Sequence, residues 1–560
     1  MQEKVARYIA NTLGLDEAPA VEVPAQESFG HYSSNVALIL SKKEGKNPRD
    51  LALEIIEKLK SSDKAGLFEK IESAGPGFIN FTLSNKALTS ELSKLAPQAP
   101  IKKGKKAKVI VELISPNIAK PMHVGHGRNA IIGESVARIL EKLDYKVTRW
   151  NYFGDWGTQF GKLILAYKMW GKKEKVEKEP IKELLALYTK FHAEGGEELE
   201  ARAREEFKKL TEGDSENTKL WKWFTKVSLI EFEKTFKELD IKFDIQKGEG
   251  SYDKKTKALV QGLLKNGIAK ESEGAIVVDL EAEGLPTALL QKSDGVSVYL
   301  TRELELLKER ISKYKAKKIL IVVGNEQTLH FQQLKAIAQK LGFLEGIEYT
   351  HIKYGLLLNE EGKKFSTRKG ELIELSELLS QLKERTRKIV EEKNPQLSER
   401  RKDEVANVVA LGAFKYNDLK ERRTSDITFN WDKMLDFNGD SAPYIQYSYA
   451  RLRGIAAKAG AKPSSKNLSL LTEKEELALA KKLLDFNGAI LQCEKEYVTS
   501  FLASYLFDLA KTANKFYENI RISTDEDKKR KSARLFLVEK TAQTLKEGLS
   551  LLGIEVLEQI

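Results

Sequence analysis

The chain has a single cysteine, Cys493, among its 560 residues. One thiol excludes a disulfide within the chain and any zinc knuckle made of several cysteines, so we expect no structural metal. Proline is also scarce, with 13 residues, and no apolar run reaches the ~18 residues that cross a bilayer. The first segment, MQEKVARYIANTLGL, carries acidic residues and lacks the continuous apolar stretch of a secretory signal. We therefore expect a cytoplasmic protein without a membrane anchor.

Charge, by contrast, is abundant. Charged residues make up 31% of the chain, and 94 Lys and Arg against 82 Asp and Glu give a net charge of +12. This surplus suits a polyanionic partner such as a nucleic acid, although the ordinary solvated surface of a soluble protein explains it equally well. The apolar content of 41% is enough for large cores, and the length allows three or four domains.

Two histidines at H-x-G-H spacing, His123 and His126, stand where a predicted strand gives way to a predicted helix. The apolar run at 109–114 fits a strand covered on both faces, and from about Gly127 apolar residues recur at helical spacing. The histidines would then lie in the loop and first turn, where free N–H groups and the helix dipole stabilise an anion such as the phosphates of ATP. Imidazoles there can stabilise charge on a phosphorus under attack, and Gly125 would let a purine approach the backbone. The alternative is that both histidines only cap the helix.

The surrounding sequence, SPNIAKPMHVGHGR, resembles the first signature of class I aminoacyl-tRNA synthetases, and specifically of the arginyl-tRNA synthetases. The loop KFSTRKG at 364–370 stands where that class has its second, lysine-rich signature. Three further segments, WNYFGDWGTQFGK, VYLTRE and GNEQTLHFQQL, are similar to the arginine-specific members, and the resemblance extends over nearly the whole chain. The matching positions of the first signature are Pro116, Asn117, Ile118, Ala119, Lys120, Pro121, Met122, His123, Val124, Gly125 and His126.

The resemblance implies a multidomain α/β protein with a Rossmann-like parallel-sheet catalytic core. The expected parts are an α+β domain that contacts tRNA (1–97), the catalytic domain (105–375) with a helical insertion (about 171–244), connecting helices (376–439) and an all-α helical bundle that binds the anticodon (440–560). After the insertion we expect the core to resume with GAIVVDL and VSVYL and to have its strongest strand at 319–323. The lysines of the linker at 96–108 belong either to a solvated connector or to a phosphate contact.

The implied reaction forms arginyl-adenylate from L-arginine and ATP, and then transfers arginine to the 2′ hydroxyl of the terminal adenosine of tRNA-Arg. Because the carboxylate of the amino acid is the nucleophile, the protein supplies positioning and charge stabilisation. By resemblance His123, His126 and Lys364 are catalytic, and Lys364 acts on the leaving pyrophosphate together with Mg²⁺. The implied ATP-binding residues are His123, Gly125, His126, Lys364, Ser366 and Arg368.

A guanidinium, planar and with five donors, is matched by carboxylates and carbonyls in a fork geometry. By resemblance Glu112 and Asn117 hold the backbone of the amino acid. Tyr299, Glu303 and Gln327 hold the rest, with Glu303 near the guanidinium. Glu303 departs from the family, which usually has Asp there, and the added methylene moves the carboxylate by about 1.5 Å. Alternatively, Glu303 lies at the start of a helix and only favours its dipole.

A second departure lies in the lysine-rich loop, where Thr367 takes the place of the second lysine of the class. Arg368 or Lys369 could supply that charge, and the alternative for the whole loop is a flexible surface segment with incidental lysines. In the GDWGTQFG segment, Asp155 and Gln159 are candidates for lining the acceptor site.

Several aromatic residues have two interpretations. Trp221 and Trp223 in the insertion either pack between helices or form a platform for bases. Tyr444, Tyr447 and Tyr449 in the C-terminal part either stack on anticodon bases or pack the bundle.

Three functions from different classes remain in view. The favoured one is an arginine:tRNA ligase with tRNA-Arg, L-arginine and ATP as partners, and the resemblance favours a monomer. A non-catalytic homologue is the second, and intact His123, His126 and Lys364 argue against it. The third, a nucleotidyltransferase for small substrates that shares the H-x-G-H site, explains neither the N-terminal match nor the helical C-terminal part.

Overall fold

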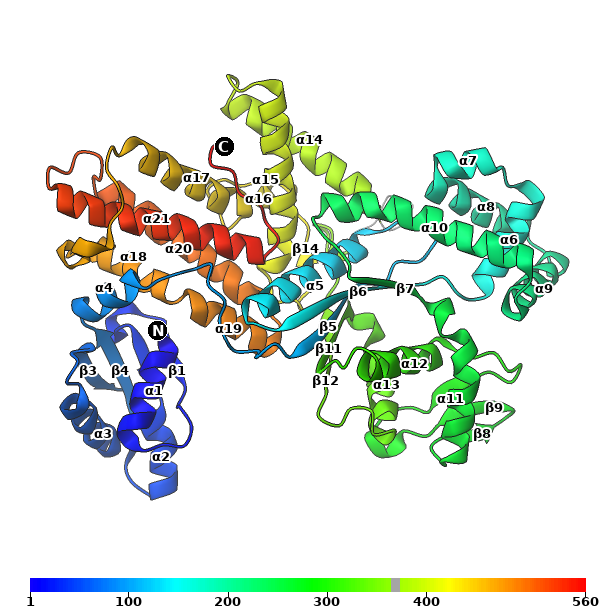
Figure 1. Cartoon of the computed structure of the whole chain (residues 1–560), viewed down its shortest axis with the longest axis horizontal. Coiled ribbons are helices and arrows are strands. Elements are labelled where there is room, and N and C mark those ends of the chain that lie inside the picture. The colour runs from blue at the N-terminus through cyan, green and yellow to red at the C-terminus, as the bar shows by residue number, and fades with distance from the viewer. Residues whose placement is uncertain (364–372) are drawn as a thin grey trace. The chain divides into compact units, whose positions relative to one another are not determined.

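The computed structural model describes residues 1–363 and 373–560, and these residues form two compact units. Unit 1 combines Met1–Ile101 with Leu435–Ile560, and unit 2 is Lys102–Met434 (Figure 1). Within the described ranges, no helix has the length and apolar character to cross a membrane.

Unit 2 is organised around a five-stranded sheet in its described residues, with the order β12-β11-β5-β6-β7 and parallel pairing throughout. Its strands are β5 (Lys108–Ile114), β6 (Lys146–Phe153), β7 (Ile245–Gly248), β11 (Lys318–Gly324) and β12 (Glu348–Tyr354). Residues 109–114 are all buried, which confirms the prediction of a strand covered on both faces. The strand predicted at 319–323 is confirmed as β11.

Helices cover this sheet and connect its strands. They include α5 (Val124–Lys142), α6 (Thr158–Trp170), α11 (Asp253–Lys265), α12 (Tyr299–Ser312) and α13 (Thr328–Lys340), with the short η2 (Glu249–Ser251), η3 (Glu281–Glu283) and η4 (Asn325–Gln327). Helix α5 follows β5 directly and packs against β5, β6 and β11. It begins three residues before the predicted start near Gly127, so His126 belongs to its first turn and His123 is its N-cap.

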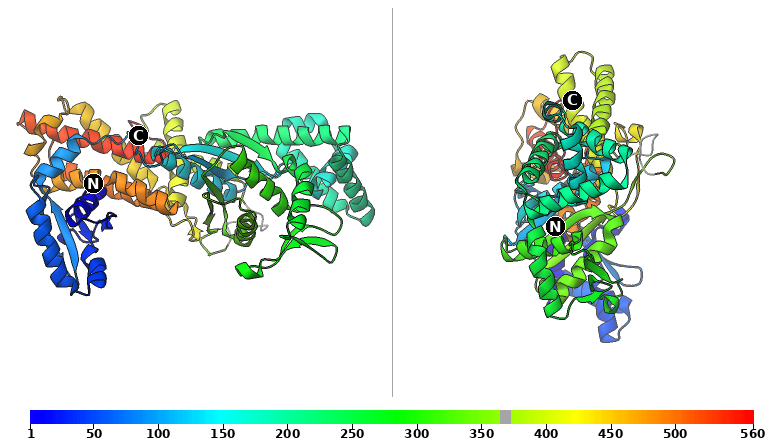
Figure 2. Two further views of the ribbon diagram at one scale, coloured as in Figure 1. Left: turned by 60° about the horizontal axis from the view of Figure 1, so that its bottom comes forward. Right: turned by 90° about the vertical axis from the view of Figure 1, so that its right-hand side faces the viewer.

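The insertion between α6 and β7 is helical, as predicted. It consists of α7 (Lys173–Lys178), α8 (Pro180–Glu194), α9 (Glu197–Glu212) and α10 (Ser215–Glu238). Helices α6 to α10 pack on one another and stand together as a group within unit 2 (Figures 1 and 2).

The two insertion tryptophans pack between helices. The ring of Trp221 meets the edge of Trp156 with 5.4 Å between centroids, and its indole N–H donates to the carbonyl of Asp155 over 2.7 Å. The ring of Trp223 meets that of Tyr167 with 5.3 Å between centroids. These contacts confirm the packing interpretation.

The segment after the insertion differs from the prediction. GAIVVDL contains β9 (Ala275–Val278), which pairs with β8 (Lys270–Ser272) and β10 (Ala288–Gln291) in a separate antiparallel sheet. VSVYL is not a strand, because Tyr299 begins α12. Both predictions of core strands were wrong, since short apolar runs do not distinguish a main-sheet strand from a side hairpin or the start of a helix.

Beyond β12 the chain forms β13 (Leu357–Leu358), α14 (Leu375–Lys393), α15 (Glu399–Leu419), β14 (Ile427–Thr428) and α16 (Trp431–Met434). A buried ion pair joins α5 to α15: Nε of Arg128 lies 2.5 Å from the carboxylate of Asp418. The same guanidinium donates to the carbonyl of Gly355 over 2.5 Å. The helix that carries the two histidines is thus fixed to the helices that follow the lysine-rich loop.

The N-terminal part of unit 1 is an α+β structure, as predicted. Its elements are α1 (Gln2–Leu13), β1 (Val21–Glu22), η1 (Glu27–Phe29), β2 (Tyr32–Ser34), α2 (Val36–Glu44), α3 (Pro48–Ser62), β3 (Phe68–Ala74), β4 (Phe78–Leu83) and α4 (Asn85–Ser93). The strands form an antiparallel sheet in the order β1-β2-β4-β3. Apolar side chains of α1 and α3, including Val5, Ile9 and Ile55, share one core with the buried strand residues.

The C-terminal part of unit 1 is helical, as predicted. It contains α17 (Ala442–Lys458), η5 (Ser465–Leu470), α18 (Lys474–Leu484), α19 (Phe486–Glu496), α20 (Ser500–Asn519) and α21 (Lys528–Leu551). Helices α17, α20 and α21 lie side by side (Figures 1 and 2). Tyr449 is buried and Tyr444 packs on Phe507 with 5.4 Å between centroids, whereas Tyr447 is 40% exposed. Tyr449 and Tyr444 therefore pack the bundle, and Tyr447 lies at its surface.

The two ends of the chain meet within unit 1. Helix α18 and η5 pack against α4, and Leu484 belongs to the same apolar core as the N-terminal sheet. The phenol of Tyr32 donates to the carboxylate of Asp485 over 2.7 Å, and the amide of Asn85 donates to the carbonyl of Leu471 over 3.1 Å. Residues more than 380 positions apart thus complete one core.

Candidate active site

The two histidines of the H-x-G-H segment form a stacked pair at the N-terminus of α5. Their ring centroids are 3.9 Å apart, with 29° between the planes. The backbone N–H of His123 donates to Nδ1 of His126 over 3.2 Å. Because Nδ1 of His126 is the acceptor, the neutral ring carries its proton on Nε2, which remains a donor. One ring nitrogen of His126 thus caps the helix, and the other is available to donate to an anion. Helix capping and anion binding are therefore compatible at this residue.

Both rings are neutral at pH 7. Burial, with a smaller effect of His123, lowers the pKa of His126 to about 3, and burial also lowers the pKa of His123. The pair therefore offers hydrogen-bond donors and no positive charge, and the positive end of the α5 dipole adds a favourable field for an anion. Positive charge for a polyphosphate must come from other residues.

The glycine between the histidines is required by the ring of His123. A Cβ atom built on Gly125 would lie 2.9 Å from Cε1 and Nδ1 of that ring. The hydroxyl of Tyr354 donates to the carbonyl of Gly125 over 3.2 Å. The structure thus gives Gly125 a role inside the protein, and the predicted approach of a purine remains a proposal.

The loop between β5 and α5 is held on two sides. The N–H of Ile118 donates to the carbonyl of Gly154 over 3.0 Å, and the N–H of Gly154 donates to the carbonyl of Pro116 over 2.9 Å. Ala119 has a left-handed backbone with φ of 63°, and its N–H donates to the hydroxyl of Ser228 in α10 over 3.2 Å. A non-glycine residue in this conformation costs roughly 1–2 kcal/mol, so its neighbours must hold the loop in place.

The predicted residues of the lysine-rich loop, Lys364, Ser366 and Arg368, lie outside the described residues, as do Thr367 and Lys369. The chain just after the loop is described, and it pairs with the histidine segment. The N–H of Val124 donates to the carbonyl of Ile373 over 3.1 Å, and the N–H of Leu375 donates to the carbonyl of Met122 over 2.9 Å. Ile373 and Leu375 thus lie beside the histidine segment.

Three buried or largely buried carboxylates meet around Tyr299 beyond the end of β5. Burial, and then the charges of these carboxylates, raise the pKa of its phenol well above the usual range. Each carboxylate has a cationic or titratable partner: Glu112 pairs with Arg310, Glu249 with Arg302 over 3.2 Å, and Glu303 with Nε2 of His330. The ring of Tyr299 lies between those of Tyr152 and His330, at centroid distances of 6.4 and 5.0 Å. With Glu112 and Glu249 paired to arginines, the cluster leaves Glu303 and the aromatic rings beside it for a planar cation.

Three of the five residues predicted to bind arginine, Glu112, Tyr299 and Glu303, are brought together in this cluster. Asn117 and Gln327 lie at the protein surface. The amide of Asn117 lies close to the backbone of Gly154, where an added Cβ would be 2.4 Å from Oδ1. Sequence reasoning missed Arg302, Arg310 and His330, although the first and last stand in the quoted segments VYLTRE and GNEQTLHFQQL.

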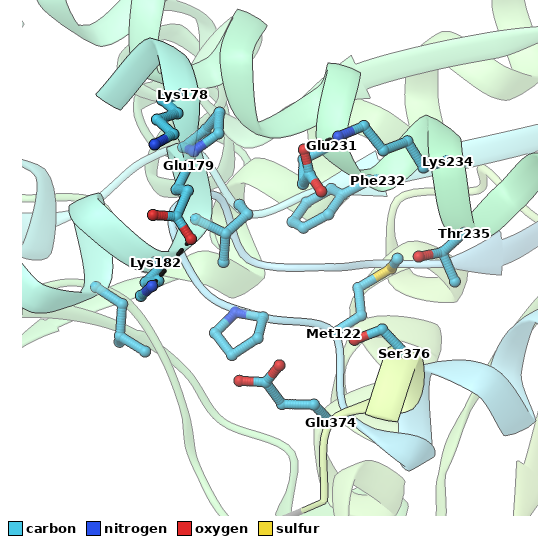
Figure 3. A pocket seen from close by; sticks show the side chains of 14 residues that line it. Met122, Lys178, Glu179, Lys182, Glu231, Phe232, Lys234, Thr235, Glu374 and Ser376 are labelled. Atoms are coloured by element: carbon cyan, nitrogen blue, oxygen red, sulfur yellow. Dashed lines mark hydrogen bonds and ion pairs between the residues drawn. The ribbon is translucent and has the colours of Figure 1, made fainter. Parts of the chain in front are cut away.

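A cavity of about 360 Å³ opens between the insertion helices and the histidine segment (Figure 3). Met122 lines it beside Phe232 and Thr235 of α10, and Glu374 and Ser376 close another side. Charged side chains of both signs surround it, among them Lys178, Glu179, Lys182, Glu231 and Lys234. Of the predicted site residues, Pro121 and Met122 line this cavity. The histidine segment is thus bordered by open space on the side of the insertion.

Comparison with protein families places three known domains on the chain. The catalytic domain of class I tRNA synthetases (R) matches residues 88–431. The arginyl-tRNA synthetase N-terminal domain matches residues 1–83, and the DALR anticodon-binding domain matches residues 445–560.

Individual relatives agree with these matches. The chain is 42% identical to an arginine–tRNA ligase of Ligilactobacillus salivarius over 96% of its own length and 94% of that protein. It is 39% identical to one of Streptococcus pneumoniae over the full length of both. Two solved arginyl-tRNA synthetase structures have the same fold. The one from Plasmodium falciparum has a TM-score of 0.85 and 27% identity over 100% of this chain and 99% of the other. The one from Thermus thermophilus has a TM-score of 0.84 and 25% identity over 100% of both chains. With a catalytic-domain match over more than half of its residues and relatives alike from end to end, the chain belongs to the class I arginyl-tRNA synthetases.

Proposed function

We propose that the chain activates L-arginine with ATP to arginyl-adenylate and transfers the arginyl group to the 2′ hydroxyl of the terminal adenosine of tRNA-Arg, in protein synthesis. One observation carries this proposal: the strand β5 has Glu112 of the carboxylate cluster near its carboxyl end and leads directly to the His123–His126 pair. An amino acid held by the cluster and a nucleotide held at α5 would meet at the carboxyl edge of the parallel sheet, where such folds bind their ligands.

In the first step the carboxylate of arginine attacks the α-phosphorus of ATP and diphosphate leaves. The protein needs no nucleophile of its own. Nε2–H of His126 and the ring of His123 donate to phosphate oxygens at the positive end of the α5 dipole, and Gly125 underlies the adenosine. Lys364, Ser366 and Arg368 complete the ATP site, and Lys364 and Arg368 supply the positive charge that the neutral histidines lack.

Mg²⁺ would enter with ATP, bound to its phosphates, and would neutralise part of their charge. Among the described residues, no group of three or more His, Cys, Asp or Glu side chains is arranged to hold a metal ion, so the phosphates of ATP would be the main ligands of Mg²⁺.

The side chain of arginine is held by Glu303, Tyr299 and Gln327, and its backbone groups by Glu112 and Asn117. Among the three clustered carboxylates, Glu112 and Glu249 already pair with arginines, whereas Glu303 contacts a histidine. Glu303 is therefore the carboxylate best placed to take the guanidinium.

The rest of the chain would bind tRNA. We assign this role to residues 1–97 and 440–560, with 105–375 as the catalytic domain and 376–439 as connecting helices.

Asp155 and Gln159, at the start of α6, would lie near the acceptor end. Burial raises the pKa of Asp155 to about 6, although the N–H of Gly250 donates to its carboxylate over 2.9 Å. We further propose that the protein acts as a monomer in the cytoplasm.

The test is ATP-dependent charging of total tRNA with labelled arginine, with lysine and glutamate in parallel and His126→Asn as the inactive variant. We expect charging with arginine alone, and its loss in the variant. Tight tRNA binding without charging by any of the three amino acids would refute the proposal and favour a non-catalytic homologue.

A further inference from the structure

The three carboxylates around Tyr299 are neutralised in two different ways. Glu112 and Glu249 face the guanidinium groups of Arg310 and Arg302, which keep their charge at every physiological pH. Among the described residues, the partner of Glu303 is His330, an imidazole that can lose its charge. Glu303 alone in this cluster can therefore be left without a countercharge inside the protein.

His330 is built into the wall of the same site. It follows η4 in the first turn of α13, and its Nε2 contacts Oε2 of Glu303, which is 4% exposed. One face of the imidazole lies toward Tyr299, with 5.0 Å between centroids and 31° between planes. On the other side its edge meets Phe331 at 5.1 Å. These contacts fix the ring, and through it one oxygen of Glu303.

We propose that His330 is a positioning residue that holds Glu303 toward the guanidinium of arginine and releases its own proton to solvent when that guanidinium binds. The inference rests on the proposed function and adds to it a titratable residue for arginine selection. The added methylene of Glu303 then has a use, because it lets the carboxylate reach the imidazole while a second oxygen remains for the substrate.

The charge balance follows from the contacts. Without arginine, a protonated His330 neutralises Glu303. A bound guanidinium supplies the same positive charge, and two cations on one buried carboxylate repel each other, so the imidazole gives up its proton. No bond other than this N–H changes.

Other titratable groups surround His330. They are Glu303 and Tyr299 from α12, Glu249 from η2 and, across Phe331, His351 from β12. Burial lowers the pKa of His330, but the charge and hydrogen bond of Glu303 together with the charge of Glu249 outweigh burial and raise the pKa above its ordinary value of 6.5. Burial also raises the pKa of Glu249 to about 7, so this carboxyl titrates in the same range and must be controlled.

The affinity for arginine should depend on pH. Below the pKa of His330, arginine must displace a proton and binds more weakly, and above it the affinity is constant. Since that pKa lies above 6.5 and should fall by at least one unit on binding, the Kd of arginine should be at least about threefold higher at pH 6 than at pH 8.

The experiment follows the histidines directly. The protein is labelled with ¹³C at the imidazole carbons, and its six histidines are titrated by NMR between pH 5.5 and 8.5, with and without saturating L-arginine. His330→Gln identifies the resonance. We expect the pKa of His330 to fall by at least one unit when arginine binds. In Glu249→Gln, the contribution of Glu249 to the pH dependence of Kd is absent and that of His330 remains. In His330→Gln, the contribution of His330 should be absent.

The matched control is His351→Gln, which alters the histidine on the far side of Phe331, bonded to the carbonyl of Val323 over 2.9 Å. It should keep the wild-type pH dependence. If arginine binds and is charged onto tRNA but the pKa of His330 does not move, the inference is overturned and the function stands. If the wild type neither binds nor charges arginine, the function fails and the inference with it.

Discussion

His126 contacts the protein through one ring nitrogen and offers the other to the site, which allows the two roles to be separated by substitution. The side-chain oxygen of Asn lies where Nδ1 lies in His, and the amide nitrogen of Gln lies near Nε2. His126→Asn should therefore keep the cap on the N–H of His123 and lose the donor, whereas His126→Gln should do the reverse.

The expected result is a fall of about 10²- to 10³-fold in kcat for arginyl-tRNA formation by His126→Asn, with its melting temperature close to the wild type. His126→Gln should retain more activity and melt earlier. Aminoacylation kinetics and thermal unfolding measure the two effects. Equal activity in the two variants would show that Nε2 does not act on ATP.

At the scale of single residues, the sequence predicted what depends on local spacing. His123, Gly125 and His126 lie within one turn, so their placement at the start of α5 follows from the neighbouring apolar periods. The ion pair of Glu112 with Arg310 joins residues 198 positions apart, and no local sequence pattern predicts it. His330 was missed for the same reason, since its contact with Glu303 depends on how α12 and α13 pack.

At the scale of elements, the buried pair of Arg128 and Asp418 joins α5 to α15. Arg128→Leu would leave Asp418 as an unpaired buried carboxylate and should lower the free energy of unfolding by about 3–5 kcal/mol. The double variant Arg128→Leu with Asp418→Leu should lose less than the single variant, because neither charge remains. Urea unfolding followed by tryptophan fluorescence measures this in unit 2, because all six tryptophans lie there.

Lys388→Ala on α14 is the control for this prediction. It removes an ion pair with Glu384 in which both side chains are about 70% exposed, so no measurable change is expected. A double variant less stable than Arg128→Leu would mean that the packing of the two side chains, rather than their charges, holds the helices together.

Elements with a long or strongly patterned sequence were predicted well. The strands β5 and β11 have nearly continuous apolar runs, and the helix α5 has apolar residues at helical spacing over several turns. VSVYL failed because Tyr299 is both β-prone and the first residue of an amphipathic helix, and four apolar residues in five cannot decide between the two. Only the helical periodicity further along the chain resolves it.

At the scale of the whole molecule, the net charge of +12 predicts how tRNA binding responds to salt. Raising KCl from 50 to 200 mM should weaken tRNA binding by about tenfold or more, because bound cations are released from the phosphates. The Kd of arginine should change little, since its buried carboxylates are screened less than surface charges. Filter binding for tRNA and calorimetry for arginine measure this, and equal salt effects on both ligands would contradict it.

The assembly of unit 1 from both ends of the chain also sets an order of events during synthesis. Unit 2 is contiguous and is complete once Met434 has left the ribosome, whereas the N-terminal residues must await the last 126. At roughly 5–20 residues per second, the interval between Ile101 and Ile560 is about 20 to 90 s. During this time two features of the N-terminal part face solvent in the nascent chain. One is the apolar surface that Leu484 later covers, and the other is the hydroxyl of Tyr32, which later donates a hydrogen bond to Asp485. The first part to be made is therefore the last to be finished, and it is where a nascent chain of this protein most needs protection from aggregation.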